Sequence, residues 1–115
     1  MSREAFVANL ENNGEYQQIL NGEPQTCGIR SGRVYLGPCE TCGQHSTNAH
    51  EEMLVFLSGH GEALIGQENK HHEVCKGKVL YIPPNTLHDI RNSGQEPLVY
   101  IYCVAPILSK SEESK

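Results

Sequence analysis

The sequence predicts an all-β domain, either a sandwich or a closed barrel. Short stretches of strand-forming residues recur along most of the chain, and turn residues separate nearly all of them. The 11 Gly and 6 Pro supply these turns. No apolar pattern with helical period runs for more than a turn or two. The length of 115 residues fits one domain with one core.

The chain divides into three parts. Residues 1–15 are polar, with sparse apolar side chains, and we expect them to form a loosely ordered lead-in. Residues 16–108 hold the predicted strands and form the single domain. Residues 109–115 contain only Ser, Glu and Lys, so they are predicted to be a disordered tail.

Runs of turn-forming residues lie between nearly all of the predicted strands. Examples of these runs are Ser31-Gly32, Gly59-His60-Gly61 and Pro83-Pro84-Asn85. The expected strands cover residues 16–20, 26–29, 33–36, 53–57, 63–65, 73–75, 79–82, 88–91 and 98–104.

Alternation within a strand assigns side chains to its two faces, because residues two apart point the same way. His50, Glu52, Leu54 and Phe56 share one face, and Glu51, Met53, Val55 and Leu57 share the other. Both faces carry apolar residues, as they also do in residues 98–104. A strand that is apolar on both sides needs cover on both sides. We therefore expect a homodimer; the alternative is that the N-terminal segment folds back over the outer face.

Composition excludes some partners. Nine basic against 14 acidic residues give a net charge of −5, the wrong sign for binding a phosphate backbone, so no nucleic-acid partner is expected. The first residues form no uninterrupted apolar run, so no signal peptide or membrane span is expected, and the predicted location is the cytoplasm. In that reducing compartment the five cysteines are expected to be free thiols or ligands rather than disulfides.

Four residues form the candidate metal site: His45, His50, Glu52 and His88. Imidazole and carboxylate groups suit Zn, Fe, Mn, Ni or Cu, provided that three or four of them converge from separate strands. Strand parity places His50 and Glu52 on one face. The set predicts a divalent transition metal, with Fe, Mn, Zn or Ni as the candidates.

The stretch that begins at His45 and ends at Gly59 resembles the first sequence motif of the cupin superfamily. In that motif two His, one residue apart, are followed by a Glu and, after six residues, by a Gly; Glu52 and Gly59 have this separation. Thr47 stands where the second His of the motif is found. His50, two residues before Glu52 on the same face, is the candidate to take its place.

The second cupin motif is similar to the series Gly77, Pro83, Asn85, His88 and Asn92. Asn85 stands where the family usually has Gly. Because Asn tolerates a positive φ better than most residues, the turn is expected to survive this change.

The resemblance covers roughly residues 33–106 and implies a small double-stranded β-helix, the jelly-roll barrel of the cupins. Members of the superfamily act as dioxygenases, isomerases, epimerases, decarboxylases, binding proteins and storage proteins, so the fold does not determine the function. One hypothesis is a metalloenzyme, dioxygenase- or isomerase-like, that binds or transforms a small organic molecule in the barrel. The alternative is a non-catalytic module that binds or senses such a molecule.

Other residues have competing interpretations. Cys39 and Cys42 have the spacing of half a zinc site, but no second pair completes it, so a turn with two incidental or mildly reactive thiols is the commoner alternative. The histidines at 60, 71 and 72 are expected at the surface. Four aromatic residues are candidates either for core positions or for the pocket wall: Phe56, Tyr81, Tyr100 and Tyr102. The three tyrosines are also the candidates for a catalytic base.

Overall fold

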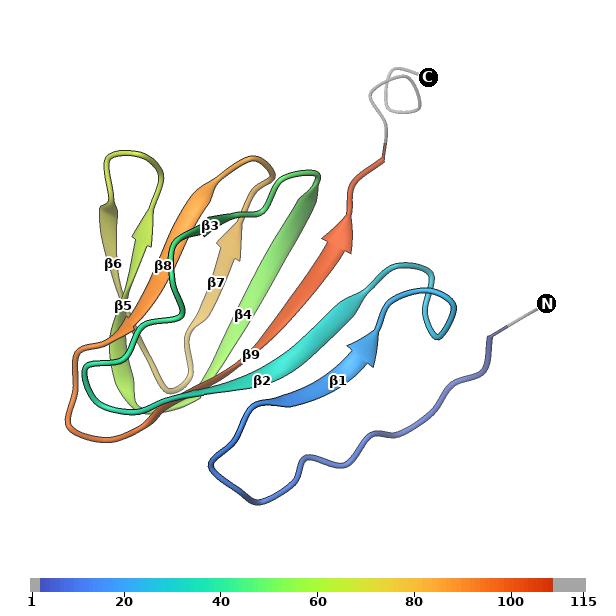
Figure 1. Ribbon diagram of the computed structural model, residues 1–115, viewed down its shortest axis with the longest axis horizontal. Helices are drawn as coiled ribbons and strands as arrows, with labels where there is room; N and C mark the ends of the chain where they lie inside the picture. Colours follow the sequence, from blue (N-terminus) through green and yellow to red (C-terminus); the bar gives the residue numbers. More distant parts are fainter. Residues whose placement is uncertain (1–2, 109–115) are drawn as a thin grey trace.

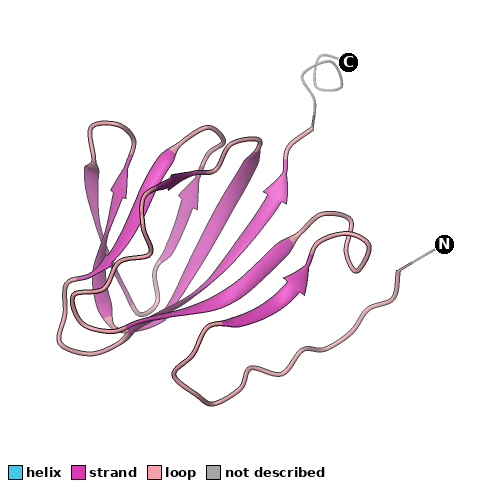
Figure 2. Cartoon of the chain, viewed as in Figure 1, coloured by secondary structure: helices cyan, strands magenta, loops and turns pink. Residues whose placement is uncertain are grey.

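The computed structural model describes residues 3–108 and contains strands and loops but no helix in that range (Figures 1 and 2). The all-β prediction is confirmed. The described part of the chain accordingly includes no helix that is long and apolar enough to cross a membrane. The strands are β1 (Gln17–Asn21), β2 (Arg30–Leu36), β3 (His45–Ser46), β4 (His50–Ser58), β5 (His60–Ile65), β6 (Lys70–Cys75), β7 (Val79–Ile82), β8 (Leu87–Asn92) and β9 (Leu98–Pro106).

The strands form two antiparallel sheets. One has the order β1-β2-β9-β4-β7, and the other has the order β3-β8-β5-β6. Figure 1 shows the long strands β2, β9 and β4 lying side by side, with β8, β5 and β6 forming the opposite wall. Neighbours in a sheet are mostly far apart in the sequence, as in a jelly roll, where strands from both halves of the chain interleave.

The core lies between the two sheets and follows the predicted alternation. On β4, Leu54 and Phe56 are each 1% exposed, whereas Met53 and Leu57 on the other face are 43% and 37% exposed. The Phe56 ring packs against Tyr100 of β9, with ring centroids 5.2 Å apart. The predicted assignment of faces on β4 is therefore confirmed, and its even-numbered residues as far as Phe56 face inward.

Two predicted features near the N-terminus are wrong. Residues 26–29 form a turn rather than a strand, because Thr26 Oγ1 accepts a hydrogen bond from Gly28 N and donates one to Ile29 O. Ser31 and Gly32, expected to separate strands, lie inside β2. Gly32 is needed there because a Cβ at this position would lie 2.7 Å from the Tyr16 hydroxyl.

Residues 3–15 form no strand and pass along the edge of β1 (Figure 1). The buried Arg33 side chain of β2 holds this lead-in by donating to Asn13 Oδ1 at 2.8 Å and to Glu15 O at 3.1 Å. Gly14 lies over the Tyr35 ring. The N-terminal segment thus covers the outer face of β2.

The outer face of β4 and β7 remains uncovered among the described residues. Met53 and Leu57 of β4 and Val79 and Tyr81 of β7 are all more than a third exposed. Self-coverage by the lead-in therefore accounts for β2 but not for this part of the sheet.

A close approach makes Gly59 indispensable between β4 and β5. It has a φ of 90°, and a Cβ there would lie 2.3 Å from Pro97 O. Gly59→Ala is expected to lower the free energy of unfolding by about 3 kcal/mol or more, through the left-handed backbone and the clash together. Gly77→Ala is the matched control, because Gly77 has a φ of 91° but open space around its Cβ. Equal losses for the two variants in urea unfolding would contradict the role of the clash.

The uncovered face of β4 and β7 leads us to expect a homodimer. Pairing would remove several hundred Å² of apolar surface from water, worth on the order of 10 kcal/mol at ~25 cal/mol per Å² before the cost of association. Light scattering at micromolar concentration should then give about twice the 12.8 kDa mass of the chain. Val55→Lys, which places a charge on this outer face, should give monomers that keep the fold. A monomeric parent protein would rule the dimer out.

Candidate metal centre

A cavity of about 540 Å³ opens between the two sheets and contains the candidate site. Apolar side chains from the core, such as Leu54 and Ile90, form its inner end. Its polar lining comprises Tyr16, Gln18, Arg30, Cys42, His45, Ser46, Thr47, Asn48, His50, Glu52, His88, Tyr100 and Tyr102. A cavity of this size suits a small organic molecule.

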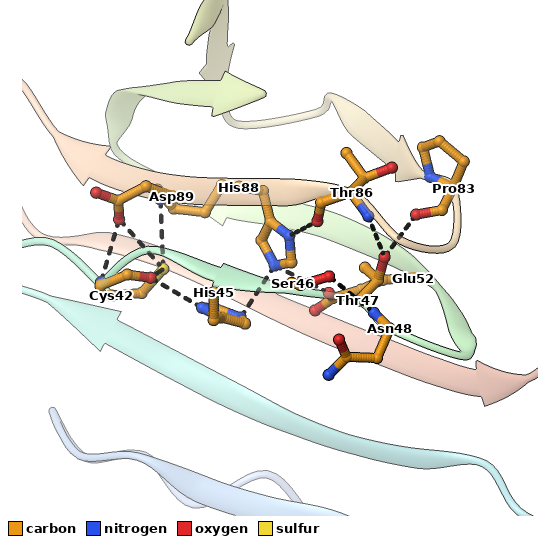
Figure 3. A network of polar contacts seen from close by, with 12 residues as sticks. Cys42, His45, Ser46, Thr47, Asn48, Glu52, Pro83, Thr86, His88 and Asp89 are labelled. Carbon is orange, nitrogen blue, oxygen red and sulfur yellow. Dashed lines mark hydrogen bonds and ion pairs between the residues drawn. The ribbon is translucent and has the colours of Figure 1, made fainter. Parts of the chain in front are cut away.

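His45, Glu52 and His88 meet at one point of this cavity, and their ligand atoms all lie within 4.8 Å of one another. His45 and His88 are direct partners across β3 and β8, with their Nε2 atoms 2.9 Å apart (Figure 3). Glu52 reaches them from β4 in the other sheet, with Oε1 3.3 Å from His88 Nε2. Three potential metal ligands from three strands therefore converge.

Backbone carbonyls fix the tautomer of both rings. His45 Nδ1 lies 2.8 Å from Gly43 O, and His88 Nδ1 lies 3.1 Å from Thr86 O. A carbonyl oxygen can only accept a hydrogen bond, so each Nδ1 carries the proton. Each neutral ring then directs the unprotonated lone pair of its Nε2 toward the other ring and toward Glu52. Such a Nδ1–H to carbonyl bond is the usual support of a metal-ligating imidazole.

This convergence fits a cation. Two lone pairs and a carboxylate at 2.9–3.3 Å repel one another unless a positive charge lies between them. Two ligands each about 2.1 Å from one ion are separated by about 3.0 Å at a right angle and about 3.4 Å at the tetrahedral angle. The separations of His88 Nε2 from His45 Nε2 and from Glu52 Oε1 are close to that range, and the donor types suit a divalent transition metal.

The protonation of His88 reflects the same convergence. His88 is 2% exposed, and this burial lowers its pKa. Hydrogen bonds to Glu52 and to Thr86 outweigh the burial, so the pKa of His88 lies above its ordinary value. In the absence of a metal, a proton is the cation that this group attracts.

His50 lies apart from the group of three. It lines the same cavity, but its ring nitrogens are not among the converging atoms. His50 is the first residue of β4 and pairs with Pro106, whereas Glu52 pairs with Val104. Two residues along a strand correspond to about 7 Å, so His50 lies one pleat closer to the end of the sheet. The structure thus brings together three of the four predicted ligands.

Thr47, at the position of the missing second His, has a structural role. Its side chain is buried, and its hydroxyl donates to Pro83 O at 2.7 Å and accepts from Thr86 N at 3.1 Å. It therefore joins the turn before β4 to the turn before β8, where Thr86 O orients His88 (Figure 3). In that second turn Asn85 has a φ of 54°, as predicted from its sequence position.

The two cysteines do not form a metal site with the histidines. Cys39 is exposed, and neither cysteine belongs to the converging group. Cys42 is half-buried and accepts a hydrogen bond from Ile90 N; burial raises the pKa of its thiol and keeps it neutral. Asp89 accepts a hydrogen bond from Gly43 N, which fixes the segment whose carbonyl orients His45.

The three tyrosines predicted as possible bases lie in different surroundings. Tyr81 is on the outer face, where its hydroxyl donates to Glu51 at 2.7 Å. Tyr100 and Tyr102 line the cavity, and burial is the main cause that raises the pKa of each hydroxyl, so both stay protonated. These two act as hydrogen-bond donors in the cavity rather than as bases.

The remaining polar residues follow the expectations in part. His60, His71 and His72 are exposed, as predicted. All five cysteines are free thiols. The supporting carbonyls and the cavity residue Arg30 were not predicted, because a carbonyl has no sequence signature and Arg30 follows a stretch that was wrongly assigned as a strand.

Comparison with known proteins agrees with this architecture. The chain is 38% identical over 68 residues to an uncharacterized protein, MJ1618, of Methanocaldococcus jannaschii; the match covers 59% of this chain and 53% of that protein. The chain therefore spans about half the length of this relative.

Two solved structures show the same fold. The BH2720 protein of Bacillus halodurans superposes with a TM-score of 0.78 at 23% identity, over 92% of this chain and 84% of that one. An RmlC-like cupin family protein with a double-stranded β-helix fold from M. jannaschii gives a TM-score of 0.73 at 17% identity, over 90% and 91% of the two chains.

The family itself is shown by the sequence. The model of the cupin domain family matches residues 32–104, which include every residue of the converging group and all strands from β3 to β8. The chain belongs to the cupin family, and its barrel is the small double-stranded β-helix of that family.

Proposed function

We propose that this cupin binds a divalent transition metal through His45, Glu52 and His88 and uses it to bind or transform a small organic molecule in the barrel. One observation carries the proposal: two Nε2 lone pairs, held by carbonyl bonds at Nδ1, face each other and a carboxylate. A metal ion at this point would balance their repulsion, and a proton on His88 takes that role when no metal is bound.

The residues of the chain have distinct roles in this proposal. The Gly43 and Thr86 carbonyls keep both rings in the ligating tautomer. Glu52 supplies a negative charge that favours a divalent ion over a proton alone. When bound, the metal supplies a Lewis acid or an oxygen-activating centre. The apolar side chains at the inner end of the cavity limit the access of water to the carbon skeleton of the ligand.

Three protein ligands leave other positions of an ion free for a small molecule. Two His and one carboxylate with open positions are typical of non-haem Fe(II) oxygenases, which favours dioxygenase-like chemistry over isomerisation. A structurally similar protein from Thermotoga maritima is described as a predicted oxalate decarboxylase, with a TM-score of 0.67 at 16% identity, over 88% and 100% of the two chains. That description supports metal chemistry on this fold without defining the reaction here.

The alternative is a non-catalytic binding or sensing module. The cavity hydroxyls of Tyr100 and Tyr102 and the Cys42 thiol all stay protonated, so none of them is a ready base or nucleophile. A cupin domain of a transcriptional regulator from Enterobacter cloacae has a similar fold, with a TM-score of 0.69 at 14% identity, over 81% and 96% of the two chains. Turnover of an organic substrate by the metal-loaded protein separates the two functions.

Elemental analysis tests the metal centre directly. Untagged protein from metal-replete medium should carry about one first-row metal per chain, and His88→Ala should lower the affinity for that metal at least about 100-fold, because it removes the most buried ligand. The fold should remain, since the barrel core does not depend on this ring. His72→Ala, which changes an exposed histidine of β6 outside the cavity, is the control and should keep the full metal content. A parent protein that neither holds nor takes up metal would refute the site.

Two adjacent carboxylates provide a sharper test of the ligand set. Glu52 faces the cavity, whereas Glu51 accepts a hydrogen bond from Tyr81 on the outer face. In competition with a chelator, Glu52→Gln should weaken metal binding at least about tenfold, and Glu51→Gln should leave it unchanged. The two variants have the same change in size and charge. The reverse order of effects would mean that the inward face of β4 has been assigned to the wrong residues.

A further inference from the structure

Arg30 introduces a positive charge into the same cavity. It is the first residue of β2, and its side chain lines the cavity together with Glu52 and the three histidines. Among the described residues that line the cavity, Arg30 is the one cation and Glu52 the one anion when histidine is counted as neutral. No hydrogen bond or ion pair joins the Arg30 guanidinium to any residue in the range 3–108.

The strand register places Arg30 opposite the metal site. Glu52 of β4 pairs with Val104 of β9, and Val104 pairs in turn with Arg30 of β2. The three residues form one row across three neighbouring strands, and all point to the inner face. Neighbouring strands lie about 4.8 Å apart, so the Glu52 and Arg30 backbones are separated by about 10 Å. A small organic molecule fits between the two groups.

The aliphatic part of the Arg30 side chain contacts Gly22. Gly22 begins the connection from β1 to β2, and a Cβ at Gly22 would lie 2.9 Å from Arg30 Cγ and 3.2 Å from Cδ. The aliphatic part of Arg30 therefore packs on a glycine that leaves room for it. This contact restricts the side chain and reduces the entropy lost when the guanidinium binds a ligand.

Further donors surround this end of the cavity. Tyr16 and Tyr102 share a hydrogen bond of 2.6 Å between their hydroxyls, and Gln18 lies beside them. A pair of hydroxyls that shares one hydrogen bond retains one further O–H to donate. The pKa of Tyr102 is raised, mainly by burial, so this donor remains protonated at neutral pH. Arg30 and this tyrosine pair together form a cluster that offers donors to an anion.

The formal charges in the cavity also favour an anionic ligand. The whole chain is acidic, with a net charge of −5, yet the formal charges of Arg30 and Glu52 cancel in the cavity. A divalent ion at the proposed metal site would make the cavity positive by two charges. The cavity would then favour a ligand with negative charge, although the protein as a whole repels anions.

We propose that the cavity binds a small organic carboxylate, whose carboxylate group is held by Arg30 and the Tyr16–Tyr102 pair while the rest of the molecule extends toward the metal site. This inference rests on the proposed function and specifies its substrate class. A planar carboxylate matches the two parallel N–H groups of a single guanidinium. Val34 and Val104, which also line the cavity, provide apolar contact for the carbon chain.

Calorimetric titration of the Zn-loaded protein tests the proposal, because zinc has no redox chemistry and binding is measured without turnover. The probes are the dicarboxylates from malonate to adipate, the neutral diamide glutaramide and glycerol 3-phosphate. At least one dicarboxylate should bind at one per chain, and at least about tenfold more tightly than glutaramide and glycerol 3-phosphate. Failure of every dicarboxylate to bind, or tighter binding of glycerol 3-phosphate, would overturn the carboxylate assignment.

Variants identify the group responsible. Arg30→Gln should raise the Kd of the best dicarboxylate at least about tenfold with unchanged metal content, and Arg30→Lys should have a smaller effect because it keeps the charge. Lys70→Gln is the matched control; it removes one positive charge from an exposed position on β6, outside the cavity, and should change Kd less than about twofold. Equal Kd values for the parent protein and Arg30→Gln would refute the role of Arg30.

Metal content is measured separately, so the two proposals can fail independently. If the chain takes up no metal, the proposed function fails, and the Arg30→Gln comparison is repeated on the metal-free protein. Loss of carboxylate binding in that comparison would support the anion subsite alone. If metal binds but no dicarboxylate depends on Arg30, the metal centre stands and the substrate class is wrong.

Discussion

The mutual repulsion of three electron-rich atoms is the constraint around which this end of the barrel is built. His45 Nε2, His88 Nε2 and a Glu52 oxygen converge from both sheets. The Gly43 and Thr86 carbonyls hold the proton of each neutral ring at Nδ1, so the Nε2 side is open either to a second proton, as the raised pKa of His88 reflects, or to a metal ion. A bound cation offsets the repulsion among the three atoms. The hydrogen bonds that hold both rings in this orientation therefore favour metal binding.

Those supporting bonds depend on residues that do not touch the metal site. Asp89 fixes the Gly43 segment through its backbone N–H, and Thr47 fixes the turn that carries Thr86. Thr47 occupies the position where the first cupin motif has its second His, so this chain replaces a ligand with a structural hydroxyl. The replacement removes one potential ligand from the metal site. It also fixes the turn whose Thr86 carbonyl orients another ligand, His88.

Sequence alternation predicted much of the barrel, because strand parity is a local property. It placed Leu54 and Phe56 in the core and selected Glu52 rather than Glu51 as the inward carboxylate. It failed at residues 26–29, where side-chain hydrogen bonds of Thr26 form a turn, and at Gly32, which lies in a strand beneath two tyrosine rings. The first failure is a local turn that the strand-like composition of residues 26–29 concealed, and the second depends on tyrosines that are distant in the sequence.

The position of Arg30 shows why the substrate end of the cavity was harder to predict than the metal end. The metal ligands lie in two motifs with fixed spacing, whereas Arg30 faces Glu52 only through the register of three strands that are distant in sequence. One central strand, β9, sets both alignments. A one-residue slip of β2 against β9 would turn Arg30 to the outer face and leave the cavity without its cation. The buried Arg33, whose side chain anchors the lead-in on the outer face, opposes such a slip, because the slip would move its charge into the cavity and release the N-terminal segment. The same alternation that buries Arg33 beneath the lead-in therefore keeps Arg30 in the cavity.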